Sequence, residues 1–113
     1  MKESPIQRLI LDWLAAERIL AFRMNTGVAK FDTRFVRFGV KGMADILSFP
    51  KLYTGCRACG DQWKDTAVVW IETKRPDGKQ SPEQKSFQQQ VEEDGHIYIL
   101  ARSLEDVQRV IGR

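Results

Sequence analysis

Three ionisable residues stand at spacings that could support hydrolysis assisted by a metal ion. Glu72 and Lys74 are two residues apart near the end of an apolar segment, residues 67–74, that is predicted to be a strand. Side chains at positions i and i+2 leave the same face of a strand, so these two project together and Thr73 is expected to point away. Asp45 lies in the preceding predicted strand and brings a second carboxylate to that face if the two strands pair.

Two carboxylates can hold a hard divalent cation such as Mg²⁺, which keeps several waters and leaves coordination positions open for phosphate oxygens. A bound metal lowers the pKa of its water and stabilises the charge of the transition state. Asp45 and Glu72 are therefore the predicted ligands, and Lys74 is predicted to orient the attacking water or to contact the scissile phosphate. A plain ion pair between Glu72 and Lys74, worth about 0–1 kcal/mol, is the alternative.

The overall charge attracts polyanions only weakly. The chain has 18 Lys and Arg against 15 Asp and Glu, a net charge of +3. A surface that binds nucleic acid must therefore come from local clusters of cations. The candidates flank the predicted acidic residues in the sequence: Arg34, Arg37, Lys41, Arg75, Lys79 and Lys85. Solvated surface cations are the alternative interpretation for each of them.

Size and composition predict one ordinary globular domain. The 113 residues contain 42% hydrophobic and 29% charged residues. No linker rich in Pro, Gly or Ser divides them, so we expect a single domain over residues 1–113. The first residues are amphipathic and lack the apolar run of a signal peptide or a membrane span. We therefore expect a soluble, cytoplasmic protein without a membrane partner.

The predicted elements follow the order α-β-β-β-α-β-α. Apolar residues from Ile6 to Leu14 recur at helical spacing, and Ser81, Pro82 and Gln84 form the start of a second helix with a capping box. Gly95 ends that helix, and Ser103 caps a third. Strands are predicted at residues 19–24, 43–49, 67–74 and 96–101. Residues 28–39 are ambiguous between loop and strand, and residues 51–66 are predicted to be a polar loop.

Three sequence segments, taken together, resemble one nuclease family. Residues 39–45 (GVKGMAD), 71–76 (IETKRP) and 81–84 (SPEQ) stand in one order at compact spacing. As a set they resemble the VRR-NUC domain, the virus-type replication-repair nuclease of the PD-(D/E)XK superfamily. The resemblance extends from residue 3 to about residue 107, and Gln7 and residues 23–27 belong to it. Ala44 departs from the proline in the superfamily's name.

The resemblance implies a fold, a cofactor and a set of site residues. It implies an α/β restriction-endonuclease-like core, a mixed central β-sheet flanked by helices, and dependence on Mg²⁺ or Mn²⁺. Asp45, Glu72 and Glu3 match the metal-binding residues, whereas Lys74 and Gln84 match further catalytic positions. For Glu3 a contact with the helix dipole is the alternative, and for Gln84 the alternative is a capping role alone.

The resemblance also implies DNA as the substrate. We expect an endonuclease of replication and repair that selects branched DNA such as Holliday (four-way) junctions. It would act as a homodimer with two active sites, in a bacterial cell or a phage-infected host. A nicking or end-processing repair nuclease is the first alternative, and a non-catalytic nucleic-acid-binding domain is the second.

Cys56 and Cys59 are spaced like half of a tetrahedral zinc site, but the other half is missing. The remaining soft ligand, His96, begins a distant predicted strand. We therefore do not expect zinc at Cys56 and Cys59 and favour free thiols in a reducing compartment. A zinc site completed across a dimer and a disulfide are the alternatives.

Overall fold

A four-stranded mixed sheet forms the centre of the protein. The computed structural model describes residues 4–24, 27–31, 34–38, 41–55 and 58–112. The strand order is β1 (Ala21–Arg23), β4 (Ile46–Ser48), β7 (Val69–Thr73) and β8 (Ile97–Ala101). The first three strands pair antiparallel, whereas β7 and β8 pair parallel. A parallel pair needs a long crossover connection, and the helix between these strands provides it.

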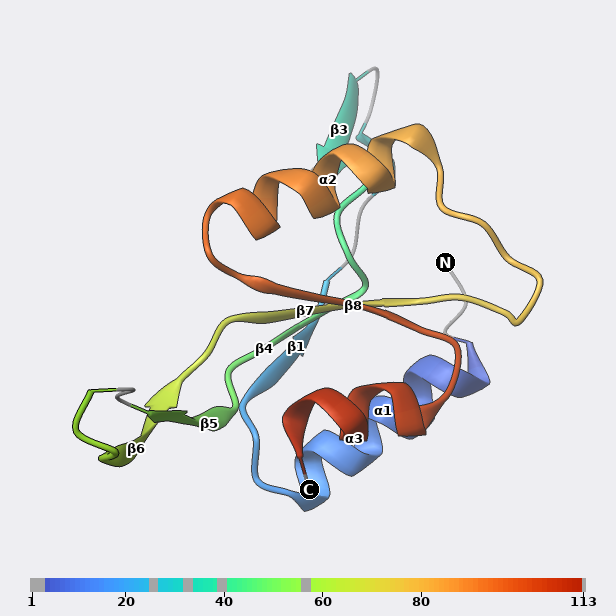
Figure 1. The fold of residues 1–113 in the computed structure, drawn as a ribbon. Coiled ribbons are helices and arrows are strands. Elements are labelled where there is room, and N and C mark those ends of the chain that lie inside the picture. Colours follow the sequence, from blue (N-terminus) through green and yellow to red (C-terminus); the bar gives the residue numbers. More distant parts are fainter. Residues whose placement is uncertain (1–3, 25–26, 32–33, 39–40, 56–57, 113) are drawn as a thin grey trace.

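Helices cover both faces of this sheet (Figure 1). α1 (Pro5–Ala16) and α3 (Leu104–Ile111) lie on one face, and α2 (Pro82–Glu93) lies on the other. Side chains of β7 alternate between the faces, as the geometry of a strand requires. Val69 and Ile71 pack in the core under α1 and α3, whereas Trp70 packs beside α2. By the same alternation, Glu72 belongs to the α2 face.

The helix starts predicted at Ser81 and Ser103 are confirmed, and a third cap, which was not predicted, begins α1. The Ser4 hydroxyl accepts a hydrogen bond from the Gln7 backbone N–H at 3.1 Å and caps α1. Ser81 caps α2 with a complete capping box, and Ser103 caps α3. Gly95 follows the end of α2 with φ of +84°, a conformation that favours glycine. Local side-chain chemistry thus fixes where the helices begin and end.

The predicted order of elements is only partly matched, because two further hairpins interrupt it. β2 (Gly27–Phe31) pairs with β3 (Arg34–Phe38), and β5 (Lys51–Gly55) pairs with β6 (Gln62–Thr66). The polar loop predicted at 51–66 was therefore wrong, and the ambiguous segment 28–39 contains strands. Both hairpins project from the central sheet (Figure 1).

In the β5–β6 hairpin, the second strand carries no pattern of burial. Every residue of β6 is exposed, so the alternation that reveals a half-buried strand is missing. Its strands are held by their backbone ladder and by surface contacts. Lys64 Nζ lies 5.0 Å from the centre of the Tyr53 ring, and Trp63 Nε1 donates to Asp65 Oδ2 at 2.7 Å.

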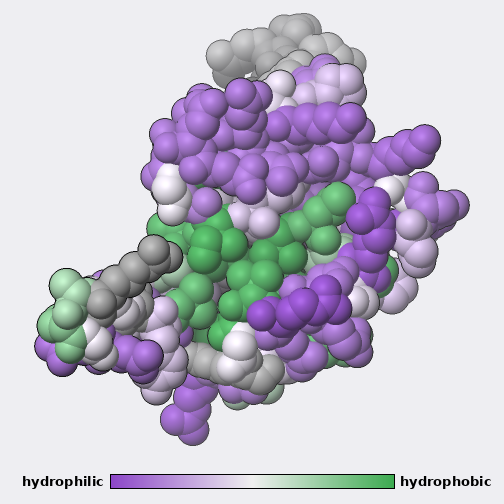
Figure 2. Space-filling view, viewed as in Figure 1, coloured by the Kyte–Doolittle hydropathy of each residue, from purple (hydrophilic) through white to green (hydrophobic). Residues whose placement is uncertain are grey.

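The β8 side of the sheet is apolar. β8 is last in the strand order, and Figure 2 shows hydrophobic side chains gathered between the two helix layers on this side. Ile97 and Leu100 are partly exposed there, and Val110 on α3 is 42% exposed. Among the described residues, no helix is both long and apolar enough to cross a membrane.

Candidate active site

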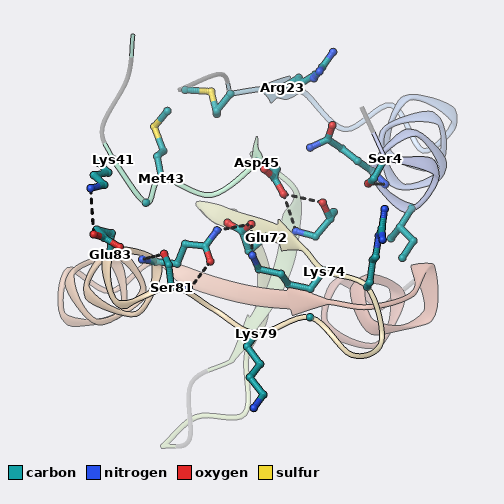
Figure 3. A pocket seen from close by; sticks show the side chains of 18 of the residues that line it. Ser4, Arg23, Lys41, Met43, Asp45, Glu72, Lys74, Lys79, Ser81 and Glu83 are labelled. Atoms are coloured by element: carbon teal, nitrogen blue, oxygen red, sulfur yellow. Dashed lines mark hydrogen bonds and ion pairs between the residues drawn. The ribbon is translucent and has the colours of Figure 1, made fainter. Parts of the chain in front are cut away.

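A cavity of about 1090 Å³ opens where β7 ends (Figure 3). Its walls come from the first turn of α1, the end of β1, residues 41–45, residues 72–79 and the first turn of α2. Asp45, Glu72, Lys74 and Gln84 all line it. The structure therefore brings these four predicted site residues together in one cavity.

Strand register places the two carboxylates side by side. Ile46 on β4 pairs with Ile71 on β7 in an antiparallel register. Asp45 precedes Ile46 and Glu72 follows Ile71, so in an antiparallel register these two residues lie opposite each other just beyond the end of β4. Directly opposed residues of an antiparallel pair have their Cβ atoms about 4.5–5.5 Å apart. Figure 3 accordingly shows Asp45 and Glu72 together at the centre of the cavity, with Lys74 nearby.

Thr73 holds the Asp45 carboxylate in place. Asp45 Oδ2 accepts hydrogen bonds from the Thr73 backbone N–H at 2.9 Å and from Thr73 Oγ1 at 2.7 Å. The sequence predicts only that Thr73 leaves the opposite face of the strand from Glu72 and Lys74, so this contact with Asp45 was not foreseen. Asp45 lies in the loop that precedes β4, so its side chain is not restricted to one face of the sheet and reaches the Thr73 hydroxyl. No sequence pattern around Thr73 reveals this contact.

Glu72 is an almost completely buried carboxylate, with 2% of the residue exposed. Its Oε1 accepts a hydrogen bond from Gln84 Nε2 at 3.1 Å and lies 4.0 Å from Lys74 Nζ. Its Oε2 is buried and has no hydrogen-bond partner among the described residues. A buried carboxylate oxygen without a partner is energetically costly, and such a group calls for an explanation.

The surroundings of Glu72 favour its neutral form. Burial raises the pKa of Glu72 to about 8, and the charge of Asp45 and the hydrogen bond that a protonated Glu72 carboxyl makes with Asp45 act in the same direction. Lys74 lowers this pKa but does not compensate. Two adjacent carboxylates in a site of low polarity cannot both ionise without an added positive charge. The pair therefore shares a proton or takes up a cation.

Gln84 caps α2 as the sequence predicts and also contacts Glu72. Its Oε1 accepts from the Ser81 backbone N–H at 2.9 Å, which completes the capping box of α2. Because the oxygen is used in this way, the amide NH₂ is turned toward Glu72. The helix cap thus orients the donor that holds the buried carboxylate.

Gly42 allows the loop before Asp45 to lie against the start of α2. A Cβ at Gly42 would collide with the Glu83 backbone oxygen and lie 2.9 Å from the Gln84 backbone nitrogen. Its φ of +84° also favours glycine. On either side, Lys41 Nζ pairs with Glu83 Oε1 at 3.2 Å, and Ala44 is fully buried in the cluster beside α2. A small residue therefore fits the position before Asp45.

The predicted cations divide into three groups. Lys41, Arg75 and Lys79 line the cavity, although Figure 3 shows Lys79 pointing away from the acidic pair. Lys85 is exposed on α2 and is not among the lining residues. The predictions for Arg34 and Arg37 concern side chains that lie outside the described part of the structure. Arg23, which was not among the predicted cations, also lines the cavity.

Asp45 and Glu72 are the described residues that could hold a divalent cation. Within the described ranges, no group of three or more His, Cys, Asp or Glu side chains is gathered. Glu3, the third predicted ligand, lies outside those ranges. The unpartnered Glu72 Oε2 beside Asp45 fits an ion that takes few carboxylates and keeps several waters, which is the preference of Mg²⁺.

The structure describes only one of the two cysteines that were predicted to be free thiols. Cys59 is exposed and forms no disulfide with any described residue. Cys56 lies outside the described residues, so the state of the pair stays a prediction.

Comparisons with protein-family models, with curated proteins and with solved structures each found no match. The resemblance to VRR-NUC domains therefore rests on the sequence motifs alone.

Proposed function

We propose that this protein is a metal-dependent nuclease that hydrolyses phosphodiester bonds in DNA. The single observation that carries the proposal is the buried Glu72 Oε2, unpartnered within the described structure and placed beside Asp45 in an open cavity. An arrangement serving only stability would satisfy this oxygen or replace it with an apolar group. A divalent cation bound by both carboxylates would satisfy it.

Mg²⁺ or Mn²⁺ bound there would supply an acidified water and positive charge near the phosphate. The residues of the chain would hold the cation and orient the reacting groups. Asp45 is fixed by Thr73 and Glu72 by Gln84, so both carboxylates are positioned before a ligand arrives. Lys74, whose side chain is 20% exposed, contacts Glu72 and lines the cavity. Its ammonium is placed to orient a water or to contact a phosphate oxygen.

The lining of the cavity suits an anionic polymer. Arg23 and Arg75 contribute positive side chains to the lining, whereas the charge of Lys41 is paired there with Glu83. Such cations balance the phosphates that must approach two carboxylates.

The finer parts of the proposal are a preference for branched DNA such as four-way junctions and action as a homodimer. Two-fold dimers are the commonest oligomers of small soluble proteins.

The test is a cleavage assay with Mg²⁺ or Mn²⁺ on duplex, flap and four-way-junction DNA. We expect metal-dependent cleavage of at least one substrate and its loss in Lys74→Met and Asp45→Asn. Lys64→Met, on the exposed β6 strand, is the matched control and should cleave normally.

The outcomes separate the alternatives. Cleavage of ends or of one strand of a duplex, with junctions untouched, would favour the nicking or end-processing nuclease. DNA binding without cleavage under any metal would favour the non-catalytic domain. Full activity in both Lys74→Met and Asp45→Asn would refute the proposed site.

A further inference from the structure

The outer edge of β8 has no partner strand in the described part of the chain. β8 is last in the order of the central sheet and pairs with β7 on its inner side. The Ile97 backbone N–H donates to the Val68 carbonyl at 2.9 Å, so the backbone groups of Ile97 point toward β7. Successive residues of a strand present their backbone groups to opposite sides. The N–H and C=O groups of Tyr98 and Leu100 therefore point outward.

Other contacts close both ends of this edge. At its start, the His96 backbone N–H donates to the Val91 carbonyl at 2.9 Å. At its end, the Arg102 backbone N–H donates to Asp106 Oδ2 at 2.9 Å. The edge thus offers the backbone groups of two residues, which lie between these closed ends, for pairing with another strand.

β8 also lacks the features that protect exposed strand edges. Its sequence, IYILA, contains no charged residue and no proline. Ile97 and Val110 lie on the α3 side of this edge and Leu100 lies on the α2 side, and all three are at least partly exposed. Figure 2 shows the hydrophobic side chains that gather here between the helix layers. An unprotected apolar edge is a template for pairing with a further strand.

A second copy of β8 that runs antiparallel would satisfy all the outward groups at once. With a two-fold axis at Ile99, Tyr98 of each copy lies opposite Leu100 of the other, and each such pair exchanges two hydrogen bonds. A shift of the register by two residues would instead oppose an outward residue to His96 or to Arg102, whose N–H groups are already used. The edge is therefore complementary to itself in one register.

The charges beside β8 on the α2 side suit the same arrangement. Glu93 and Asp94 are exposed at the end of α2, next to the start of β8. Lys85 is exposed near the start of α2, and Arg102 is exposed directly after β8. An antiparallel pair sets the start of each strand against the end of the other. The acidic end of one copy would then meet the basic end of its partner.

We propose that two copies of this chain associate by antiparallel pairing of their β8 edges, which joins the two central sheets into one continuous sheet. The same patch is used by both copies, as a two-fold dimer requires. The inference rests on the homodimer of the proposed function and gives it an interface. Its test measures association and does not depend on cleavage.

The first test measures the mass of the protein in solution by sedimentation. The chain has a mass of 13.0 kDa, and we expect twice that mass at about 10–100 μM. Leu100→Lys places a charge at the edge, as natural edge strands do to prevent pairing, and Val110→Lys does so at a position that is already 42% exposed. Each should raise the dimer Kd at least about tenfold. Leu9→Lys, at an exposed position of α1, is the matched control and should leave the Kd unchanged.

The second test examines the register by cross-linking. The two copies of residue 99 would form a non-hydrogen-bonded pair with Cα atoms about 4.5 Å apart, which is within the range of a disulfide. In a Cys56→Ser, Cys59→Ser background, Ile99→Cys should give a covalent dimer on mild oxidation. Ala15→Cys, at an exposed position of α1, should not.

Several results would overturn the inference. One is a monomeric mass throughout the concentration range, and another is a dimer that both lysine substitutions leave intact. A folded Ile99→Cys dimer that does not cross-link would refute the register. If Ile99→Cys does not fold, the effect of Val110→Lys on the mass decides. A chain that is monomeric alone but binds an extended apolar peptide would assign the edge to a different protein. Absence of metal-dependent cleavage would refute the nuclease proposal separately.

Discussion

At the scale of single residues, Glu72 is the group whose ionisation state matters most. Its ordinary pKa of 4.5 is raised to about 8 by burial, the charge of Asp45 and their side-chain hydrogen bond. The folded protein therefore binds a proton that the unfolded chain releases above about pH 4.5. In the absence of metal, the contribution of Glu72 to stability is fully present below that pH and is lost as the pH rises through about 8.

We predict that the free energy of unfolding of the metal-free protein falls across this pH window. The Glu72 contribution has a slope of at most about 1.4 kcal/mol per pH unit. Urea unfolding at several pH values, with a chelator present, measures it. Glu72→Gln removes the titrating group while keeping the side-chain volume, so its profile should be flatter. Identical profiles for both proteins would show that Glu72 ionises normally when buried.

At the scale of elements, the first turn of α2 links helix stability to the candidate active site. Gln84 closes the capping box with its oxygen and holds Glu72 with its nitrogen. A glutamate at the same helix position also closes a capping box, but it cannot donate to Glu72. This difference separates the two functions of the side chain.

We predict that Gln84→Glu keeps the capping box but lowers the free energy of unfolding by about 1–3 kcal/mol, because a third carboxylate replaces the donor to Glu72, and lowers cleavage at least about tenfold. Ser81→Ala should affect stability alone. It loses the cap, at a cost of about 1 kcal/mol, but keeps the donor to Glu72 and most of the activity. Denaturant unfolding and initial cleavage rates measure both variants. Normal cleavage by Gln84→Glu would show that the contact with Glu72 is dispensable.

Helices and strands were predictable from the sequence where residues close together in the chain determine them. The caps at Ser4, Ser81 and Ser103 are each encoded within a few residues, and the predictions that used Ser81 and Ser103 were confirmed. The β5–β6 hairpin was not predictable, because every residue of β6 is exposed and the pairing of the two strands is carried by backbone groups. The contact of Thr73 with Asp45 depends on where a separate loop arrives, which spacing along one strand does not reveal.

At the scale of the whole molecule, the site is assembled from segments far apart in the sequence. Asp45 and Glu72 approach each other only when β4 and β7 have paired, and Gln84 arrives on the connection to β8. The unfolded chain therefore lacks the site, and an ion that binds it stabilises the folded state through linkage.

We predict that Mn²⁺ raises the Tm of the protein. At a free concentration of one hundred times its Kd, a ligand that binds only the folded state contributes about 2.7 kcal/mol. Thermal unfolding with increasing Mn²⁺ measures the shift, and a chelator should reverse it. Asp45→Asn should show a much smaller shift than the unmodified protein. No shift at millimolar Mn²⁺ would contradict a metal site at Asp45 and Glu72.

The pairing of Ile46 with Ile71 has a consequence for the specificity of the fold itself. If β7 slipped by one residue against its neighbours, every side chain of the strand would change face. Glu72 would then enter the apolar layer under α1 and α3, and Ile71 would replace it beside Asp45. The buried acid therefore acts against mispaired forms of the sheet, because a misaligned strand would bury a carboxylate among apolar side chains and would also lack the proposed ion site.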